Sequence, residues 1–361
     1  MSHKKKTASA HTRLAETDLV MRVLLRAFVV SLAFVVFVGL AAGVCGAQTR
    51  GPEVSIPSIT PDLRVMTWNI EGRNVRSADS KKPCGFTLKS EVYLDNIEKE
   101  IKRHERLDVI ALQEVYRSQA EGLQSRLKGY LGMAPKLYFA ETVTCEDSKK
   151  DFGIALISRH PFADGSPQQG SLCFHIKQLL DLDLRLKPNC GMKEDRKLER
   201  VIINVEGRLV YIYNTHLGLG RKLEDAQAAL ILRQVSYDRD HRQAGFPFRP
   251  VLMGDFNVGW DTDAYRRLTR GSFFDTWRQA DHDLEDCDVA GFTLPTSAPR
   301  FHADYVFAGD GAFKVISAHV TCRKKLFEEF GLLEKGKTSQ GKIDYDKVPD
   351  HLPLVAHILY L

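Results

Sequence analysis

Apolar residues from Leu63 onward form short runs that alternate with longer helical patterns. Ser90–Arg106 is predicted to be a helix, because its apolar residues recur on one helical face among charged ones. Leu223–Asp240 is predicted to be a second helix. The other apolar runs are short and β-rich, which is typical of strands. We expect strands at Leu63–Ile70, Asp108–Leu112, Phe152–Ser158, Pro250–Met253, Tyr305–Phe307, Ala312–His319 and Leu354–Leu361.

A β-hairpin is predicted where Arg200–Val205 and Arg208–Asn214 flank Glu206-Gly207, because such a pair favours a tight turn. Strands that alternate with helices and are mixed with hairpins indicate α/β layers around mixed sheets. The pattern shows no second core, so residues 63–361 are predicted to form one domain. Residues 48–62 are rich in Pro and polar residues and are predicted to be a linker.

The first 47 residues are interpreted as a leader. Residues 27–44 form an uncharged apolar stretch whose length lies between that of a signal-peptide core and a membrane-spanning helix. Cys45-Gly46-Ala47 has small residues where signal peptidase cleaves, and Met21 offers a second start. A cleaved signal peptide and an uncleaved membrane anchor through residues 27–44 both remain open. Under either interpretation the rest of the chain is exported, and it is periplasmic, secreted or membrane-anchored.

Composition changes this picture in two ways. The net charge of +5 arises mostly in the leader, which holds six Lys or Arg against two acids and leaves 45 basic against 44 acidic residues elsewhere. The net charge therefore does not indicate a nucleic-acid partner. Cysteines outside the leader form no close Cys-x-x-Cys pair, and in an exported chain we expect at least one disulfide. These cysteines are Cys84, Cys145, Cys173, Cys190, Cys287 and Cys322.

Several predicted strands begin or end at polar residues that a core strand does not need for packing. These residues are Asn69, Glu114, His216, Asp255 with Asn257, Asp304, and Asp350 with His351. Each one alone is an ordinary turn, cap or surface residue. Buried carboxylates are costly unless they are paired or bound to metal, and sites in layered α/β folds gather where strands end. If the strands lie side by side, we expect these side chains to converge.

This ordered set resembles the endonuclease/exonuclease/phosphatase superfamily, which includes pancreatic-type deoxyribonuclease, neutral sphingomyelinases and inositol polyphosphate phosphatases. The matching segments are Val65–Asn69, Val109–Glu114, Gly153–Arg159, Tyr213–Leu217, Gly254–Asn257, Asp304–Phe307 and Asp350–Leu354. The resemblance implies an α/β (α+β) fold, a four-layer sandwich in which two mixed β-sheets pack face to face with helices outside.

The resemblance further implies a metal-dependent hydrolase that breaks phosphoester bonds by in-line attack of water. Mg²⁺ is the implied ion, with Mn²⁺ or Ca²⁺ possible, because oxygen ligands suit these ions. The implied metal ligands are Asn69, Glu114 and Asp350. The implied catalytic residues are His216, Asp255, Asn257, Asp304 and His351. Asp304 would pair with His351, and the general base remains open between His351 and Asp255.

The substrate remains open among nucleic acid, phospholipid and phosphomonoester, with a phosphodiester and a nuclease slightly favoured. Basic clusters at Arg185–Arg200 and Arg323–Lys325 could follow a phosphate backbone. A lipid hydrolase needs exposed apolar residues at its mouth. Candidates for these are Phe327, Phe330, Leu332 and Leu333. The alternative from another class is a non-catalytic binding protein on the same fold. We expect a monomer.

Overall fold

The computed structural model describes residues 61–74, 87–88, 90–145, 151–163, 167–171, 196–282, 291–295, 300–322, 326–327 and 349–361. Residues Thr60–Leu361 form one compact unit. The predicted leader, and the linker apart from residues 61–62, lie outside the described residues and stay predictions. Within the described part of the chain, no helix has the length and apolar character needed to cross a membrane.

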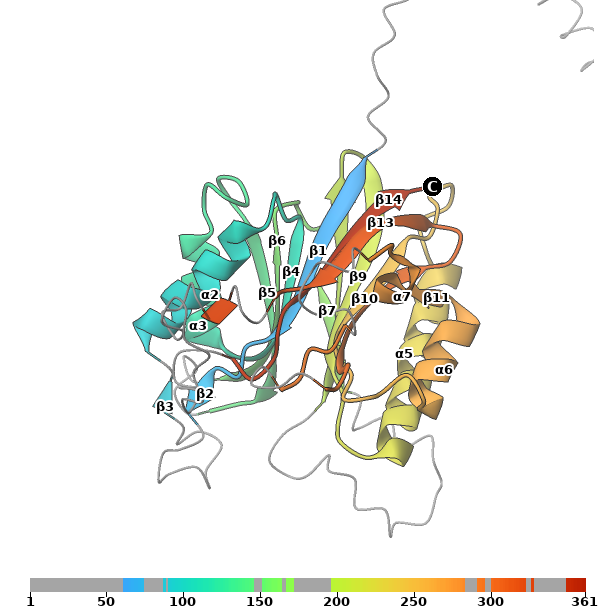
Figure 1. Cartoon of the computed structure of the whole chain (residues 1–361). Coiled ribbons are helices and arrows are strands. Elements are labelled where there is room, and N and C mark those ends of the chain that lie inside the picture. Colours follow the sequence, from blue (N-terminus) through green and yellow to red (C-terminus); the bar gives the residue numbers. More distant parts are fainter. Residues whose placement is uncertain are drawn as a thin grey trace, which may run out of the picture. The chain divides into compact units, whose positions relative to one another are not determined.

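Two six-stranded sheets dominate the compact unit (Figure 1). The first has the order β13-β14-β1-β4-β6-β5 and the second the order β11-β12-β10-β9-β8-β7. The strands of the first sheet are β1 (Asp62–Asn69), β4 (Val109–Tyr116), β5 (Lys136–Val143), β6 (Phe152–Ser158), β13 (Phe313–Val320) and β14 (Leu354–Tyr360). Those of the second are β7 (Gln168–Ser171), β8 (Lys197–Val205), β9 (Arg208–His216), β10 (Pro250–Asp255), β11 (Phe273–Asp275) and β12 (Asp304–Gly309). A separate short pair joins β2 (Arg73–Asn74) to β3 (Thr87–Leu88).

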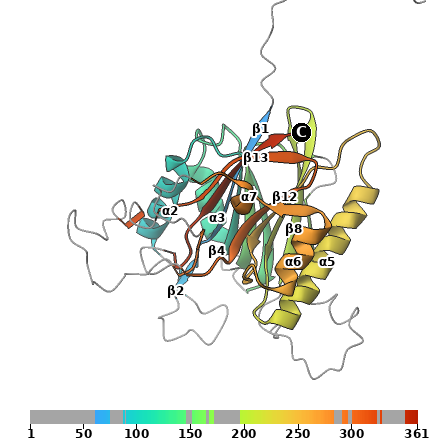
Figure 2. The same cartoon turned by 45° about the vertical axis from the view of Figure 1, so that its right-hand side comes forward.

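Helices cover the outer faces of the two sheets (Figure 2). The first sheet is covered by α2 (Glu91–Arg103) and α3 (Arg117–Arg126), and the second by α5 (Arg221–Asp240) and α6 (Asp263–Gly271). The short helix α7 (Thr276–Gln279) lies beside β11, β12 and β13. The layers are therefore helix, sheet, sheet and helix, which confirms the predicted four-layer sandwich.

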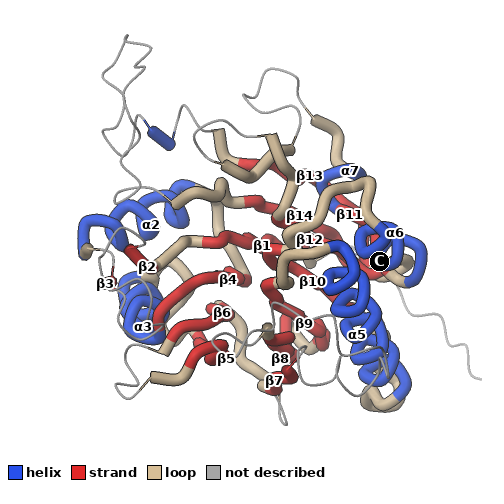
Figure 3. The backbone as a smooth tube through the Cα atoms, turned by 90° about the horizontal axis from the view of Figure 1, so that it is seen from below, coloured by secondary structure: helices blue, strands red, loops and turns tan. Residues whose placement is uncertain are grey.

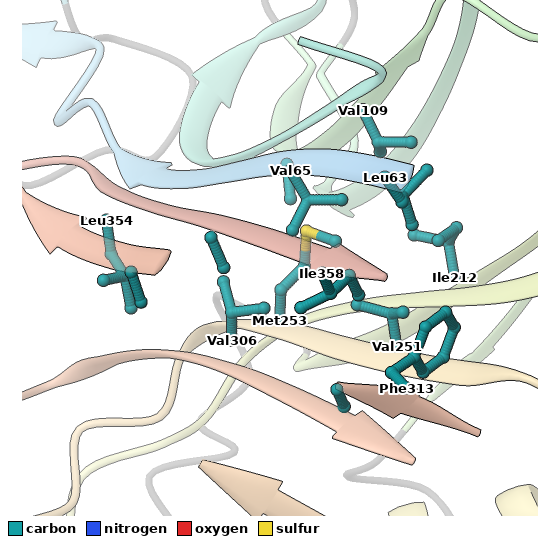
Figure 4. Packing of buried hydrophobic residues seen from close by; sticks show 14 of the residues in the cluster. Leu63, Val65, Val109, Ile212, Val251, Met253, Val306, Phe313, Leu354 and Ile358 are labelled. Atoms are coloured by element: carbon teal, nitrogen blue, oxygen red, sulfur yellow. The ribbon is translucent and has the colours of Figure 1, made fainter. Parts of the chain in front are cut away.

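Three apolar layers hold the sandwich together. The central layer lies between the two sheets, where Val65 and Ile358 of the first sheet face Ile212, Val251 and Met253 of the second (Figure 4). A second layer joins α2 and α3 to the first sheet, and a third joins α5 and α6 to the second. Successive side chains of a strand point to opposite faces, so each strand contributes to the central layer and to one outer layer.

The predicted elements are confirmed with small shifts of their ends. The hairpin is formed by β8 and β9, and both turn residues, Glu206 and Gly207, have positive φ. The strand predicted at Asp108–Leu112 continues to Tyr116 through a register shift. β5 and α3 were not predicted, because β5 is a half-exposed edge strand and α3 buries only Gln119, Ala120 and Leu123.

Two observations concern the cysteines and the segment before β14. Cys145 and Cys322 are both disulfide-bonded, as expected for at least one disulfide. Phe327 is only 3% exposed and joins the central apolar layer, so its prediction as an exposed residue at the mouth is wrong. The other candidates for the substrate region lie outside the described residues: Phe330, Leu332, Leu333, Arg323–Lys325 and most of Arg185–Arg200.

Candidate active site

The candidate site lies at one end of the central apolar layer. β1 is parallel to β4, and β9 is parallel to β10, so the carboxyl ends of these four strands share one edge. β12 and β14 run antiparallel to their neighbours β10 and β1, so their first residues lie at the same edge. Since β1 runs downward in Figure 1, the view from below in Figure 3 looks onto this edge.

The polar side chains of the site continue the inward-facing rows of the central layer. On β10, Val251 and Met253 lie in this layer, and Asp255 follows on the same face. The same alternation applies to the other strands. The rows end at Asn69 on β1, His216 on β9, Asp255 on β10 and Asp304 on β12. Because side chains alternate along a strand, each of these four strands places one polar group on the face between the sheets. The four groups come from both sheets and lie in one buried space.

Asp304 and His351 form a buried carboxylate–imidazole pair. Nδ1 of His351 lies 2.7 Å from Oδ2 of Asp304, although the two residues are 47 positions apart in the chain. Burial by itself lowers the pKa of His351, but the charges of Asp304 and Asp255 and the hydrogen bond to Asp304 raise it. The resulting pKa lies well above the usual value of histidine. These charges favour the protonated form of His351, and its Nε2 faces Asp255 at 3.7 Å.

Asp255 lies at the centre of the site. Its Oδ2 accepts a hydrogen bond from Nδ2 of Asn69 at 3.0 Å and lies 3.4 Å from Nε2 of His216. Its Oδ1 accepts from the backbone N–H of Asn257 at 2.9 Å. Burial raises the pKa of Asp255 to about 7, although the positive charge of His351 lowers it. The carboxyl group therefore changes protonation near neutral pH.

Asn257 has a half-buried side chain beside Asp255. Its Nδ2 donates to the carbonyl of Leu217 at 3.0 Å, which uses one of the two amide hydrogens. Its backbone has a positive φ of 54°, a conformation that asparagine tolerates better than most residues. The chain therefore bends sharply after β10, and the side-chain amide of Asn257 stays at the site.

Glu114, Asn69 and Asp350 complete the set on the side of the first sheet. Nδ2 of Asn69 also donates to Oε1 of Glu114 at 3.4 Å. Glu114 has a φ of 53° within the register shift of β4, which interrupts the regular alternation of that strand. Oδ1 of Asp350 lies 4.0 Å from Nε2 of His351. Burial raises the pKa of Tyr93, and the charges of Glu71, Asp350 and Glu114 raise it further, so these carboxylates gather around one phenol.

The residues present fit a metal ion. Asp255, Asp304 and His351 bring possible ligand atoms within 4.8 Å of one another, and the two carboxylates can bind a cation even while His351 is protonated. Oδ1 of Asp304 is buried and has no hydrogen-bond partner among the described residues, which is unfavourable unless a cation or ligand contacts it. The predicted ligands Asn69, Glu114 and Asp350 border the same space. All eight predicted site residues therefore belong to one connected cluster, although their individual roles stay predictions.

Comparison with known proteins identifies the family of the chain. A model of the Endonuclease/Exonuclease/phosphatase family matches residues 66–323. The chain belongs to this family. Members of the endonuclease/exonuclease/phosphatase family are metal-dependent hydrolases of phosphoester bonds, and this chain is a phosphoesterase of that superfamily. Comparison with curated protein sequences gives no match.

Solved structures with the same fold support the assignment of the architecture. The endonuclease/exonuclease/phosphatase from Bacteroides vulgatus is 18% identical, with a TM-score of 0.55 over 83% of this chain and 100% of that one. A mannosyl-6-phosphatase from Bacteroides thetaiotaomicron is 16% identical, with a TM-score of 0.53 over 82% and 99%. The human Nocturnin catalytic domain, solved with a bound sulfate anion, is 18% identical, with a TM-score of 0.55 over 84% and 96%. At these identities the similarity shows the fold alone.

Two residues near the site were not found from the sequence. Thr293 hydrogen-bonds to the backbone beside both Asp304 and His351, and Glu71 lies close enough to affect Tyr93. Glu71 follows Asn69 by two positions and is one further polar residue after the same strand. Thr293 lies in no predicted element, and no pattern in the sequence distinguishes it from an ordinary loop threonine.

Proposed function

We propose that this chain is an exported, Mg²⁺-dependent phosphodiesterase and that its substrate is a nucleic acid. The observation that carries the proposal is the buried Asp304–His351 pair facing Asp255. A hydrolase of phosphoester bonds must bind negatively charged oxygens and activate water, and this cluster offers an imidazolium and a carboxylate for the two tasks.

The residues divide the chemistry as follows. Asp304 occupies Nδ1 of His351, which leaves Nε2 to donate a hydrogen bond to a phosphoryl oxygen. Asp255 accepts the proton of the attacking water, because its carboxylate is the acceptor that faces the open side of His351. His216 and the remaining amide hydrogen of Asn257 bind oxygens of the phosphoryl group or the nucleophile. We thus assign the base to Asp255 and anion binding to His351.

A divalent cation would be held by Asn69, Glu114 and Asp350, with Asp255 at its edge. These are amide and carboxylate oxygens, the ligands that Mg²⁺ prefers. When bound, the ion neutralises negative charge on the phosphoester and acts as a Lewis acid. Oδ1 of Asp304, which is buried and has no hydrogen-bond partner among the described residues, is a further acceptor in the cluster.

Two features support export. Residues 27–44 have the apolar pattern of a signal peptide or anchor. Cys145 and Cys322 are disulfide-bonded, and disulfides persist in oxidising compartments rather than in the cytosol. We propose a periplasmic or secreted monomer, anchored to the membrane if the leader is retained. Fractionation of producing cells, followed by mass measurement of the N-terminus, tests both points. Full-length protein in the cytosol would contradict export.

Phosphomonoester hydrolysis is the second candidate, because one protein with this fold is named a mannosyl-6-phosphatase. The present chain shares only 16% identity with it. A phospholipid phosphodiesterase is less supported, since Phe327, one of its expected exposed residues, is buried.

Incubation of the full chain with supercoiled plasmid, in Mg²⁺ or in EDTA, tests the proposal. We expect nicking in Mg²⁺ and none in EDTA. The His351→Ala variant should lose at least about 100-fold in rate, because a preorganised donor to the phosphoryl group is removed. His241→Ala, at the exposed end of α5 away from the site, should nick at the wild-type rate.

Plasmid that stays intact in every lane would overturn the nuclease proposal. The same proteins would then be assayed on p-nitrophenyl phosphate and on phosphatidylcholine vesicles. Hydrolysis of either one, abolished by His351→Ala, would identify the alternative substrate class. Absence of hydrolysis of all three would contradict phosphoesterase activity toward these classes.

A further inference from the structure

We propose that Thr293 is a positioning residue that holds both members of the Asp304–His351 pair. The proposal rests on the function proposed above and identifies a residue that keeps the pair in register. The two members of the pair lie on different parts of the fold, so their contact needs a residue that links them. Asp304 begins β12 of the second sheet, whereas His351 precedes β14 of the first sheet. Their hydrogen bond therefore depends on two separate segments and two separate sheets.

Thr293 contacts the segment that carries Asp304 through its side chain. Its Oγ1 accepts hydrogen bonds from the backbone N–H groups of Ala303 and Asp304, both at 3.3 Å. Its own N–H donates to the carbonyl of Phe301 at 2.9 Å. The side chain is fully buried, so water does not replace these contacts. The hydroxyl thus fixes the backbone at the start of β12, from which the side chain of Asp304 extends.

The carbonyl of Thr293 contacts the segment that carries His351. It accepts a hydrogen bond from the N–H of Leu352 at 2.8 Å. The carbonyl of the same peptide unit, that of His351, accepts from Nε1 of Trp68 at 2.9 Å. The peptide unit after His351 is therefore held on both sides, by Thr293 and by an indole on β1. A plane held at both polar groups cannot rotate without breaking a buried hydrogen bond.

Thr293 is therefore one residue that joins the two halves of the pair. Its hydroxyl holds the amide of Asp304, and its carbonyl holds the amide that follows His351. Its hydroxyl and its carbonyl act on different segments, so removing the hydroxyl shifts Asp304 relative to His351 while the contact to Leu352 remains. A small misplacement of reacting groups can lower a rate strongly while leaving ground-state binding almost unchanged.

The side-chain contact is tested by Thr293→Val, which keeps the shape but removes the acceptor. We expect kcat of the full chain on plasmid or a dinucleotide phosphodiester to fall about 10-fold, with KM within about twofold of wild type. Thr293→Ser restores the hydroxyl and should recover at least about half of the wild-type kcat. Thr276→Val is the matched control, because Thr276 is equally buried and its hydroxyl donates to the carbonyl of Val306 in the same strand β12. It should keep the wild-type kcat at a temperature where all variants are folded.

A second readout needs no turnover. The Nδ1 proton of His351, hydrogen-bonded to Asp304, is expected as a downfield proton resonance that disappears in His351→Ala. In Thr293→Val this resonance should shift or broaden, and in Thr276→Val it should stay unchanged. If the wild-type protein hydrolyses no phosphodiester, the proposed function fails and the resonance alone tests the role of Thr293.

Three outcomes would overturn the proposal. The first is a Thr293→Val variant with wild-type kcat and an unchanged His351 resonance. The second is a Thr293→Ser variant that loses as much kcat as Thr293→Val, which would indicate a loss of packing. The third is an equal loss of kcat in Thr276→Val, which would indicate general loosening of β12.

Discussion

At the scale of single residues, burial determines which carboxyl groups keep a proton. Asp275 is 3% exposed and caps the N-terminus of the short helix α7, where its Oδ1 accepts from the N–H of Trp277 at 3.0 Å. Its Oδ2 accepts from the hydroxyl of Tyr265 at 3.1 Å. Burial raises the pKa of Asp275 to about 6, although these hydrogen bonds act in the opposite direction. A carboxyl group that is not part of the candidate site thus has a pKa raised to about 6.

This shift predicts how stability depends on pH. The folded protein keeps the proton of Asp275 up to about pH 6, whereas the unfolded chain releases it near its ordinary pKa of 3.8. The folded state binds more protons between these values, so this group's contribution to the free energy of unfolding falls as pH rises through that window. Asp275→Asn removes the dependence. Relative to wild type, the variant should gain on the order of 2–3 kcal/mol between pH 3.5 and pH 7.5 in urea denaturation.

The exposed residue Asp281 provides the control for this measurement. Asp281→Asn should show the same pH dependence as wild type. An Asp275→Asn curve parallel to that of wild type from pH 3.5 to pH 7.5 would contradict the raised pKa.

At the scale of elements, the pairing of β9 with β10 places Asp255 beside His216. The two strands are parallel, with Gly254 opposite Thr215 and Asp255 opposite His216. Gly254 has a φ of 146°, and a Cβ at this position would lie 2.0 Å from the carbonyl oxygen of Thr215. Only glycine allows the two backbones to approach so closely. Gly254 therefore determines how closely Asp255 and His216 approach each other.

Gly254→Ala should push β10 away from β9. We expect a loss of more than about 3 kcal/mol in the free energy of unfolding, because both the backbone conformation and the close contact are violated. Hydrolysis should fall as well, since Asp255 moves relative to His216. Gly170→Ala in β7 is the matched control, because no atom of the described residues lies within 4 Å of its Cβ position. Chemical denaturation that finds the two variants equally stable would contradict this account of the pairing.

At the scale of the whole molecule, disulfides lie at both edges of the first sheet. Cys145 follows β5 and Cys322 follows β13, the two edge strands of the sheet order. Neighbouring strands are about 4.8 Å apart, so five spacings separate these edges by roughly 24 Å. A disulfide joins Cα atoms that are only about 4–7 Å apart. Cys145 and Cys322 therefore belong to two different disulfides.

Both disulfides should contribute to stability. Cys145→Ala and Cys322→Ala should each lower the free energy of unfolding by about 2–4 kcal/mol, because each removes a constraint on the unfolded chain. Scanning calorimetry should show a lower Tm for each variant. Adding a reductant should lower the Tm of wild type further than that of the variant with both substitutions. Tm values that neither substitution nor reductant changes would rule out a structural role.

Much of the site follows from local patterns in the sequence. The alternation of Val251, Met253 and Asp255 indicates that a carboxylate lies on the same strand face as core residues. The alternation along β9 indicates the same for His216. What the pattern of one strand does not state is which strands are neighbours. The parallel pairing of β9 with β10 and the antiparallel return of β12 bring these faces to one edge. Without that pairing each polar residue is an ordinary strand-end residue.

Other features were beyond local patterns for specific physical reasons. Glu114 itself was predicted as a site residue, but the register shift and positive φ through which it reaches the site depend on the partner strand β6 and were not predicted. β5 is a half-exposed edge strand, so it lacks the apolar run of a central strand. Phe327 has acidic neighbours in the sequence, yet it is buried against a core formed by residues distant in the chain. Thr293 has no local signal at all, because its partners lie in two other segments.

The sequence by itself determined most of the central strands, two of the helices, the layered class and the identity of the polar residues that end the strands. These depend on side-chain periodicity and on turn residues, which act within a few positions of the chain. The family resemblance implied that Asp304 pairs with His351, and the structure shows this contact across 47 residues. Only the tertiary structure decided that Asp255 takes an elevated pKa and that Thr293 joins the two segments. Each of these results depends on burial and on contacts between different strands, which exist only once the two sheets have packed together.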